Sequence, residues 1–271
     1  MYTLTNDELE ISILDPVADQ TRFGPRYCTG GYIFQITDVR HGPLLTGPTY
    51  PASFNWFDGQ GIPDAFNLHP LREPTEATPL ALIIGVGVCD LQQNQVQEFC
   101  HWEIAPAPAQ LSMRTTQTFH GFALALERTV SLSSRTVHST TRVKNTGRLP
   151  LPICWFPHPF FPQPATPELC RFNVPVHMPE NPGYAVGENG FIRRKASPTP
   201  HGDYQALDHA AQTALVVLQR HPALGLVAAT CSYVPGLFPI WGNQYTFSWE
   251  PFFERTLAVG QETTWGMAYD F

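Results

Sequence analysis

The chain has 271 residues, 43% of them hydrophobic, which excludes a disordered chain and permits a large core without disulfide or metal support. The formal net charge is −7 and no basic cluster is longer than Arg193-Arg194-Lys195, which argues against nucleic acid as a partner. No stretch is apolar over the length of a membrane-spanning helix, and no apolar leader opens the chain, so we expect a soluble, cytoplasmic protein with no membrane partner.

The composition favours strands over helices. Only 14% of the residues are charged, whereas exposed helix faces are normally rich in Glu, Lys and Arg. The 27 prolines and 20 glycines leave few uninterrupted stretches of a dozen residues. The six cysteines form no C-x-x-C pair, and in a reducing compartment we interpret them as small core residues. We therefore expect one all-β domain spanning residues 1–271.

The first half of the chain begins with candidate strands at residues 8–14 and 31–37. A long, proline-rich connection follows at residues 43–79, and such connections often line binding sites. The more apolar run at residues 80–89 is expected to form one central strand. Period-two alternation predicts strands at residues 122–132, 137–143 and 149–155, which we expect to pair consecutively as an antiparallel meander with an Asn145-Thr146-Gly147 turn.

The second half begins with another long, proline-rich connection at residues 161–200. A hairpin is then expected from residues 214–219 and 226–233, around a turn at 221–225, and two final strands at 246–250 and 263–269. A dozen or more short strands with tight turns indicate a sandwich or a barrel.

One histidine lies in an aromatic setting at residues 155–161, Trp-Phe-Pro-His-Pro-Phe-Phe. Prolines on both sides of His158 restrict its backbone. Aromatic rings beside a polar group suit a sugar, because its C–H face packs on a ring while its hydroxyls need hydrogen bonds. We expect Trp155 to supply such a ring. The alternative is a histidine that is simply satisfied inside an aromatic core.

A carboxylate has a comparable setting at residues 247–254, Phe-Ser-Trp-Glu-Pro-Phe-Phe-Glu. Glu250 is out of step with Phe247 and Trp249, so on a strand it faces away from them. Apolar surroundings disfavour the charged form and raise the pKa toward the working range of a general base. The alternative is a solvated carboxylate at the end of a strand.

Together these segments resemble the aldose 1-epimerase (galactose mutarotase) superfamily. In that family an N-T-G turn precedes an H-x-Y/F-F motif, as Asn145-Thr146-Gly147 precedes His158-Pro159-Phe160-Phe161 here. The family also has a Glu, then a P-G-E-like turn and a terminal strand, to which Glu250, Val259-Gly260-Gln261-Glu262 and residues 265–271 are similar. The resemblance covers the second half of the chain more closely than the first.

The resemblance implies a β-supersandwich of antiparallel sheets with a sugar on one concave face. His158 would be the general acid that protonates the ring oxygen, and Glu250 the general base that takes the proton from the anomeric hydroxyl. The ring would open to the aldehyde and close from the other face, giving the other anomer. This chemistry needs no cofactor or metal, and its partner is a small-molecule sugar.

Three further residues are candidate sugar contacts. Arg26 could donate to sugar hydroxyls or form a surface ion pair. Asn243 follows Trp241 and Gly242 just before the Glu250 strand, where related proteins line the cleft. Asp208, within Leu207-Asp208-His209, resembles a sugar-contacting Asp of the family.

The family's N-terminal G-R-x-A-N-R and N-H-L-H-G-G motifs have no clear counterpart here. A non-catalytic sugar-binding protein on the same scaffold is therefore an alternative. Arg193-Arg194-Lys195 raises a second alternative, a mutarotase of hexose 6-phosphates. A glycoside hydrolase would need two carboxylates, Glu250 with Asp64 or Glu254, and Glu254 is expected too far along the same strand. Zinc is not expected, since Cys100, His101, His120 and His138 lack regular ligand spacing.

Overall fold

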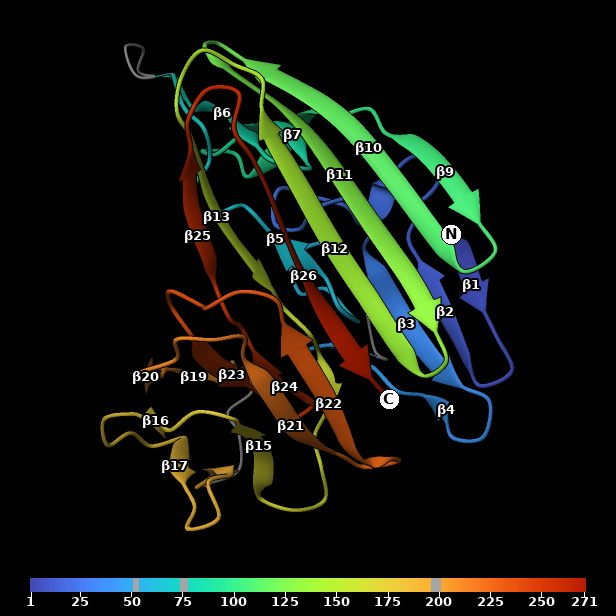
Figure 1. Cartoon of the computed structure of the whole chain (residues 1–271), viewed down its shortest axis with the longest axis vertical. Coiled ribbons are helices and arrows are strands. Elements are labelled where there is room, and N and C mark those ends of the chain that lie inside the picture. Colours follow the sequence, from blue (N-terminus) through green and yellow to red (C-terminus); the bar gives the residue numbers. More distant parts are fainter. Residues whose placement is uncertain (51–53, 74–77, 196–200) are drawn as a thin grey trace.

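The long strands β26 (Glu262–Asp270), β12 (Thr136–Asn145), β11 (Phe122–Ser133) and β10 (Gln110–Phe119) lie side by side in one large antiparallel sheet (Figure 1). The computed structural model describes residues 1–50, 54–73, 78–195 and 201–271. The large sheet has ten strands, in spatial order β17 (Tyr184–Val186), β18 (Ile192–Arg194), β15 (Glu168–Phe172), β21 (Val216–His221), β22 (Gly225–Cys231), β26 (Glu262–Asp270), β12 (Thr136–Asn145), β11 (Phe122–Ser133), β10 (Gln110–Phe119) and β9 (Glu103–Ala107).

Smaller sheets pack around this one. Behind the long strands in Figure 1 lies an N-terminal sheet of β1 (Tyr2–Thr5), β2 (Leu9–Ile13), β3 (Ile33–Asp38) and β4 (Gly42–Pro43). The others are β6 (Leu80–Ile83), β7 (Gly87–Asp90) and β8 (Gln95–Phe99); β25 (Phe253–Leu257), β13 (Leu151–Pro157) and β5 (Asp64–Ala65); β14 (Phe161–Pro162), β24 (Thr246–Trp249), β23 (Pro239–Gly242) and β19 (Asp203–Ala206); and β16 (Val176–His177) with β20 (Asp208–His209).

The all-β expectation is confirmed. Gln20–Arg22, a single 3₁₀ turn, is the helical segment of the described chain, in which no helix is both long and apolar enough to cross a bilayer. All six cysteines are described; each is a free thiol, and five are buried. The hairpin expected around residues 221–225 is present as β21 and β22.

The single strand expected at residues 80–89 is wrong. The run instead folds back on itself as the hairpin β6–β7, in which Leu80 pairs with Asp90 and Ile83 with Gly87. Gly85 has a φ of +74° and Gly87 a φ of +136°, conformations that glycine adopts readily. The apolar run is buried on both arms, so its composition resembles that of one central strand.

The expected three-strand meander is only partly right. Strands β11 and β12 pair as predicted, but β12 then pairs with β26 from the end of the chain. The third predicted strand, β13, pairs with β25 and β5. Strand β25 and the long β10 were not predicted. The connection expected at residues 161–200 contains short strands β14 to β18, and residues 196–200 lie outside the described ones.

A buried ion pair lies in the core between the sheets. The alternating side chains of β11 that face inward include Arg128, which is 1% exposed. Its guanidinium donates to the carboxylate of Asp64 on β5 and to the hydroxyl groups of Thr141 and Ser139. Because a buried charge is costly without partners, this network ties the large sheet to β5 and occupies Asp64.

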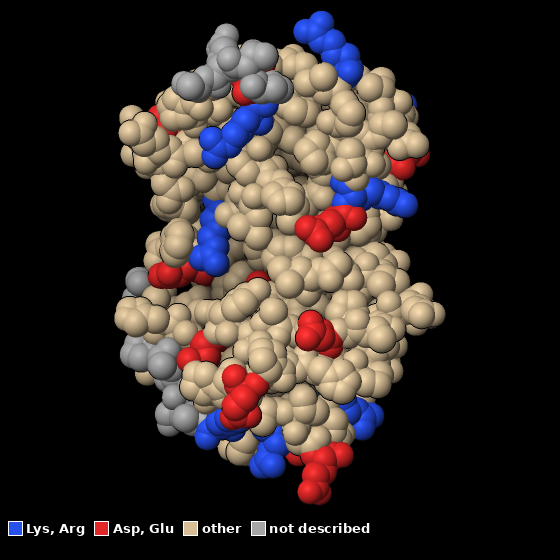
Figure 2. Space-filling view, turned by 90° about the vertical axis from the view of Figure 1, so that its left-hand side faces the viewer, with Lys and Arg blue, Asp and Glu red and all other residues tan. Residues whose placement is uncertain are grey.

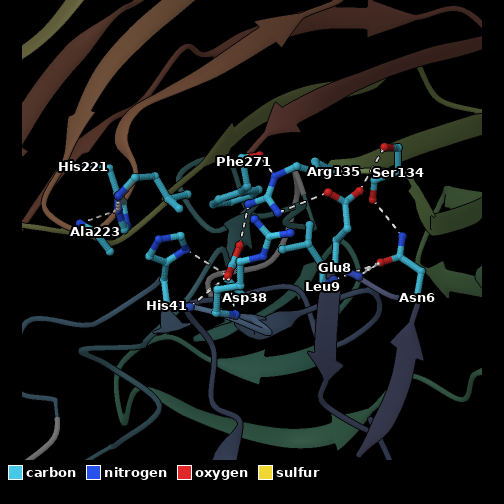
Figure 3. Close-up of polar contacts among 12 residues, drawn as sticks. Asn6, Glu8, Leu9, Asp38, His41, Ser134, Arg135, His221, Ala223 and Phe271 are labelled. Atoms are coloured by element: carbon cyan, nitrogen blue, oxygen red, sulfur yellow. Dashed lines mark hydrogen bonds and ion pairs between the residues drawn. The ribbon is translucent and has the colours of Figure 1, made fainter.

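A second polar cluster joins the N-terminal sheet to the C-terminus (Figure 3). The Asp38 carboxylate is 2% exposed and accepts from the Arg135 guanidinium at 2.6 Å and from the backbone N–H groups of Arg40 and His41. Arg135 Nε also donates to the carbonyl of Phe271. Burial opposes ionisation of Asp38, but these donors outweigh it and hold its pKa below the ordinary value.

We expect Asp38→Asn to lower the free energy of unfolding by about 1.5–3 kcal/mol, because a hydrogen bond to a charged group contributes about that much. Since the folded-state pKa of Asp38 is depressed, this contribution is present above the unfolded pKa of about 3.9 and fades as pH falls below it. Urea unfolding at pH 7 and pH 3.5 measures both effects. Asp7→Asn, at an exposed position, is the matched control, and equal stability of the two variants at pH 7 would contradict the prediction.

Candidate active site

Prolines on both sides of His158 determine which backbone N–H groups of this segment can donate hydrogen bonds. Pro157 and Pro159 have no N–H group, so His158 and Phe160 are the donors of this stretch. His158 N–H donates to the carbonyl of Pro63 at 2.8 Å, and Phe160 N–H to that of Gly61 at 2.7 Å. The backbone approaches closely here, because a Cβ on Gly61 would lie 2.3 Å from the carbonyl oxygen of Ile33. The imidazole is thereby held on a rigid strand extension.

Glu250 reaches the same place from the end of β24. Its N–H donates to the carbonyl of Pro239 at 2.9 Å, so the residue is anchored to β23. On β24, Phe247 and Trp249 are buried in the core, where Trp249 Nε1 donates to Gln219. Glu250 instead lines a cavity. The predicted separation of Glu250 from its two aromatic neighbours is confirmed.

His158 Nε2 and Glu250 Oε1 lie 3.4 Å apart, and the residues are 4% and 6% exposed. The His158 ring stacks on Phe160 with a centroid distance of 4.4 Å and meets Tyr27 and Trp241 edge-on. A cluster of buried apolar residues, which includes Tyr27, Phe156 and Phe160, packs around the imidazole. The imidazole and the carboxylate thus share one buried, aromatic environment.

Burial controls the protonation of the pair. It raises the pKa of Glu250 to about 8, and the nearby Arg26 guanidinium only partly opposes this. Burial also lowers the pKa of His158 well below its ordinary value, and Arg26 lowers it further. At neutral pH the pair therefore holds one proton, on Glu250, beside a neutral imidazole.

The pair opens into a cavity of about 540 Å³, within the usual range of small-molecule sites. Its described lining comes from the connection between β2 and β3, the loop before β5, the β13 extension, and β19, β23 and β24 with their turns. The lining residues are Arg26, Pro48, Thr49, Phe57, Asp58, His158, Phe160, His201, Tyr204, Trp241, Asn243, Tyr245 and Glu250. From the connection at residues 43–79, Pro48, Thr49, Phe57 and Asp58 line this cavity, and a binding role for the connection stays a prediction. Residues 51–53 and 74–77 of that connection lie outside the described chain.

Arg26 and Asn243 both lie at this cavity, but their side chains differ in how free they are to contact a ligand. The Arg26 guanidinium is partly exposed, lies over the rings of Phe57 and Tyr27, and donates to the carbonyl of Phe57. Asn243 is 3% exposed and already bonded, because its Oδ1 accepts from the backbone of Tyr245 and Thr246 and its Nδ2 donates to the carbonyl of Pro48. Asn243 therefore shapes the cavity wall, and Arg26 presents a cation to it.

Trp155 and Asp208 do not lie at the cavity, which corrects their expected place beside a sugar. Successive side chains of a strand face opposite sides, so Trp155 points away from Phe156 and His158 and packs on Tyr233 and Trp265 in the core. Asp208 is exposed on β20, which pairs with β16.

The second carboxylates considered for a hydrolase, Asp64 and Glu254, are absent from the cavity lining. Asp64 is engaged with Arg128, and Glu254 is exposed on β25, a separate strand from that of Glu250. The second lining carboxylate is Asp58, which sequence reasoning missed together with Phe57, Tyr204, Tyr245 and His201. The aromatic and acidic run Trp56-Phe57-Asp58 inside a proline-rich connection was the available signal for two of them.

The basic cluster at residues 193–195 also lies away from the pair. Arg193 is exposed on β18, Arg194 donates to the carbonyls of Pro164 and Thr166, and Lys195 pairs with Glu180. Figure 2 shows one face of the molecule, on which basic and acidic side chains are scattered over a mostly uncharged surface. Among the described residues no group of three or more His, Cys, Asp or Glu side chains is arranged to hold a metal ion.

Comparison with solved structures places this architecture in a known fold. A galactose mutarotase-related enzyme from Lactobacillus acidophilus superposes with a TM-score of 0.64 at 11% identity, covering 99% of this chain and 96% of that one. A galactose mutarotase-like protein from Lactobacillus casei gives 0.57 at 12% identity, covering 100% and 99%. An aldose epimerase homologue from C. elegans gives 0.51 at 10% identity, covering 99% and 97%. No protein-family model and no curated protein matches the sequence.

The chain therefore has the galactose mutarotase-like fold, an all-β supersandwich of antiparallel sheets. The resemblance found in the short motifs of the second half extends, as a fold, over nearly the whole chain. At these identities the likeness concerns the fold, and the chemistry of the site is argued from its own residues.

Proposed function

We propose that this protein is a mutarotase of the aldose 1-epimerase type, which interconverts the α and β anomers of an aldose. The observation that carries the proposal is the 3.4 Å contact between His158 Nε2 and Glu250 Oε1 at the buried end of a polar and aromatic cavity. Two groups that share one proton, with pKa values moved in opposite directions by burial, form an acid–base pair.

Ring opening uses the pair with its proton on His158, which that proton reaches from Glu250 across the contact. Glu250 takes the proton of the anomeric hydroxyl, and the O1 electrons form the C1=O1 double bond. The C1–O5 bond breaks, its electron pair stays on O5, and His158 protonates O5. The pair then holds its proton on Glu250, the group that holds it at neutral pH.

Ring closure uses the reverse arrangement. After rotation about C1–C2, O5 attacks the other face of C1 while neutral His158 takes the O5 proton and Glu250 returns a proton to O1. The pair and the sugar each end with the protons they began with. Such positioned proton transfers typically contribute about 10²–10⁴-fold each.

The charges of the cavity favour a neutral sugar. Arg26 is the sole Lys or Arg among its described lining residues, and its guanidinium is already engaged with Phe57. Asp58 lies in the same lining, and its Oδ2 accepts from the Asn55 amide at 2.7 Å. Arg26 and Asp58 can bind hydroxyls as donor and acceptor, whereas a phosphate would meet an unfavourable carboxylate.

We expect no preference for glucose 6-phosphate over glucose, and no loss of activity in Arg194→Ala, because residues 193–195 do not line the cavity. Polarimetry with the fresh α-anomer of each sugar measures this. A preference for the phosphorylated sugar that Arg194→Ala abolishes would instead favour the hexose 6-phosphate alternative.

The proposal itself is tested by following the optical rotation of freshly dissolved α-glucose and α-galactose with and without the protein. A mutarotase brings the rotation to equilibrium faster without changing the final value. Calorimetric binding of a sugar without any acceleration would favour the non-catalytic sugar-binding alternative. A lack of both binding and acceleration across a panel of aldoses would contradict sugar handling altogether.

A further inference from the structure

Three large aromatic side chains at the cavity are left exposed. Phe57 is 53%, Tyr204 58% and Tyr245 48% exposed, and all three line the cavity of His158 and Glu250. We call them the aromatic rim. They come from three separate segments: the loop before β5, strand β19, and the turn between β23 and β24. Exposed apolar groups that gather at one site commonly mark a contact surface.

The exposed fraction of the lining side chains differs between the two ends of the cavity. His158 and Glu250 are 4% and 6% exposed and form its inner end, with Phe160 fully buried beside them. The rim residues are about half exposed and form its mouth. A sugar that reacts by the proposed mechanism must place C1 and O5 at the inner end. Whatever is attached to the other carbons of that ring then extends toward the rim.

We propose that the substrate is a reducing oligosaccharide of at least two rings, with the reducing ring at His158 and Glu250 and the next ring on the aromatic rim. This rests on the proposed function for the orientation of the reducing ring. The C–H faces of a pyranose pack on aromatic rings, and the tyrosine hydroxyls can bond to sugar hydroxyls. A free hexose that reaches the inner end leaves the rim without a partner.

The polar groups at the mouth suit a sugar better than an apolar protein surface. Asp58 and the exposed His201 line the same cavity as the rim rings. An apolar partner would bury these groups without hydrogen bonds, whereas a sugar offers hydroxyls to each of them.

The test compares kcat/KM for mutarotation of glucose with that of cellobiose, maltose and melibiose, which carry a free reducing end and differ in linkage. We expect at least one disaccharide to exceed glucose by roughly tenfold, as stacking on two or more rings would provide. In Tyr204→Ala/Tyr245→Ala the ratio should fall to about one. Leu226→Ala and Val259→Ala, at exposed apolar positions outside the cavity, should keep the wild-type ratio. Thermal unfolding checks that the variants are folded.

Calorimetry with the same sugars separates this inference from the proposed function. Tighter binding of a disaccharide than of glucose, lost in the double variant, supports the inference even if no sugar is turned over. Acceleration of glucose with no disaccharide preferred in rate or affinity overturns the inference and leaves the mutarotase intact. A double variant that changes the oligomeric state in sedimentation, with the sugar ratio unchanged, overturns it in favour of a protein contact.

Discussion

Glu250→Gln is expected to slow the protein-catalysed interconversion of anomers by about 10²–10⁴-fold while sugar binding stays measurable. Glutamine keeps the shape and hydrogen-bonding capacity of the side chain but cannot carry the proton between O1 and the pair. His158 then faces the sugar without its partner at 3.4 Å. Polarimetry on a fresh α-anomer gives the rate, and the fluorescence of Trp241, which lies at the cavity, reports binding.

Glu254→Gln is the matched control for this variant. Glu254 is an exposed glutamate four positions further along the chain, outside the cavity lining, and its substitution should leave the rate within twofold of wild type. Glu250→Gln combined with His158→Gln should be little slower than either single variant, because the two residues act as a unit. A Glu250→Gln variant with the wild-type rate would remove the acid–base pair from the mechanism.

The catalysed rate should fall as pH rises above about 8, roughly tenfold per unit and about a hundredfold by pH 10. The pKa of Glu250 is raised, so its proton leaves as pH passes through that value. His158 is neutral there because its pKa lies well below the ordinary one. The pair then holds no proton and has no acid for O5. As pH falls below about 8, the rate should stay level until the pair takes up a second proton, on His158.

Initial rates across pH, corrected for spontaneous mutarotation at each pH, measure this profile. A rate that rises through pH 8 would mean that an ionised Glu250 beside a neutral imidazole is the active form, contrary to the shared-proton mechanism. The Glu254→Gln variant should reproduce the wild-type profile, since Glu254 does not contact the pair.

Strands whose side chains alternate between core and solvent were predictable from local sequence. Strands β11 and β12 and the hairpin β21–β22 are examples, because each has one buried face. The prediction for residues 80–89 was wrong because both arms of the hairpin β6–β7 are buried, which removes the alternation of buried and exposed side chains. The pairing of β13 could not be predicted from local sequence, since its partners β5 and β25 come from distant parts of the chain.

The residues of the candidate site likewise differ in whether local sequence could predict them. His158 and Glu250 could be predicted because each lies in an unusual aromatic and proline-rich motif and the two motifs together resemble those of a known family. Trp155 was misplaced because its strand turns it to the opposite side from His158. Asp58, Tyr204 and Tyr245 join the pair at the cavity only through tertiary packing of three separate segments, and no local pattern marks their convergence.

In the proposed mechanism, one proton shared by His158 and Glu250 opens and closes a sugar ring in this cavity. Exchange spectroscopy by proton NMR tests it most directly, on an equilibrated mixture of glucose or cellobiose anomers, since it measures interconversion without any net reaction. Under the proposed mechanism we expect exchange cross-peaks between the α and β anomeric protons with wild-type protein and with Glu254→Gln, and their loss in Glu250→Gln. Bound sugars that show no anomeric exchange with the wild-type protein, or equal exchange with Glu250→Gln, would contradict it.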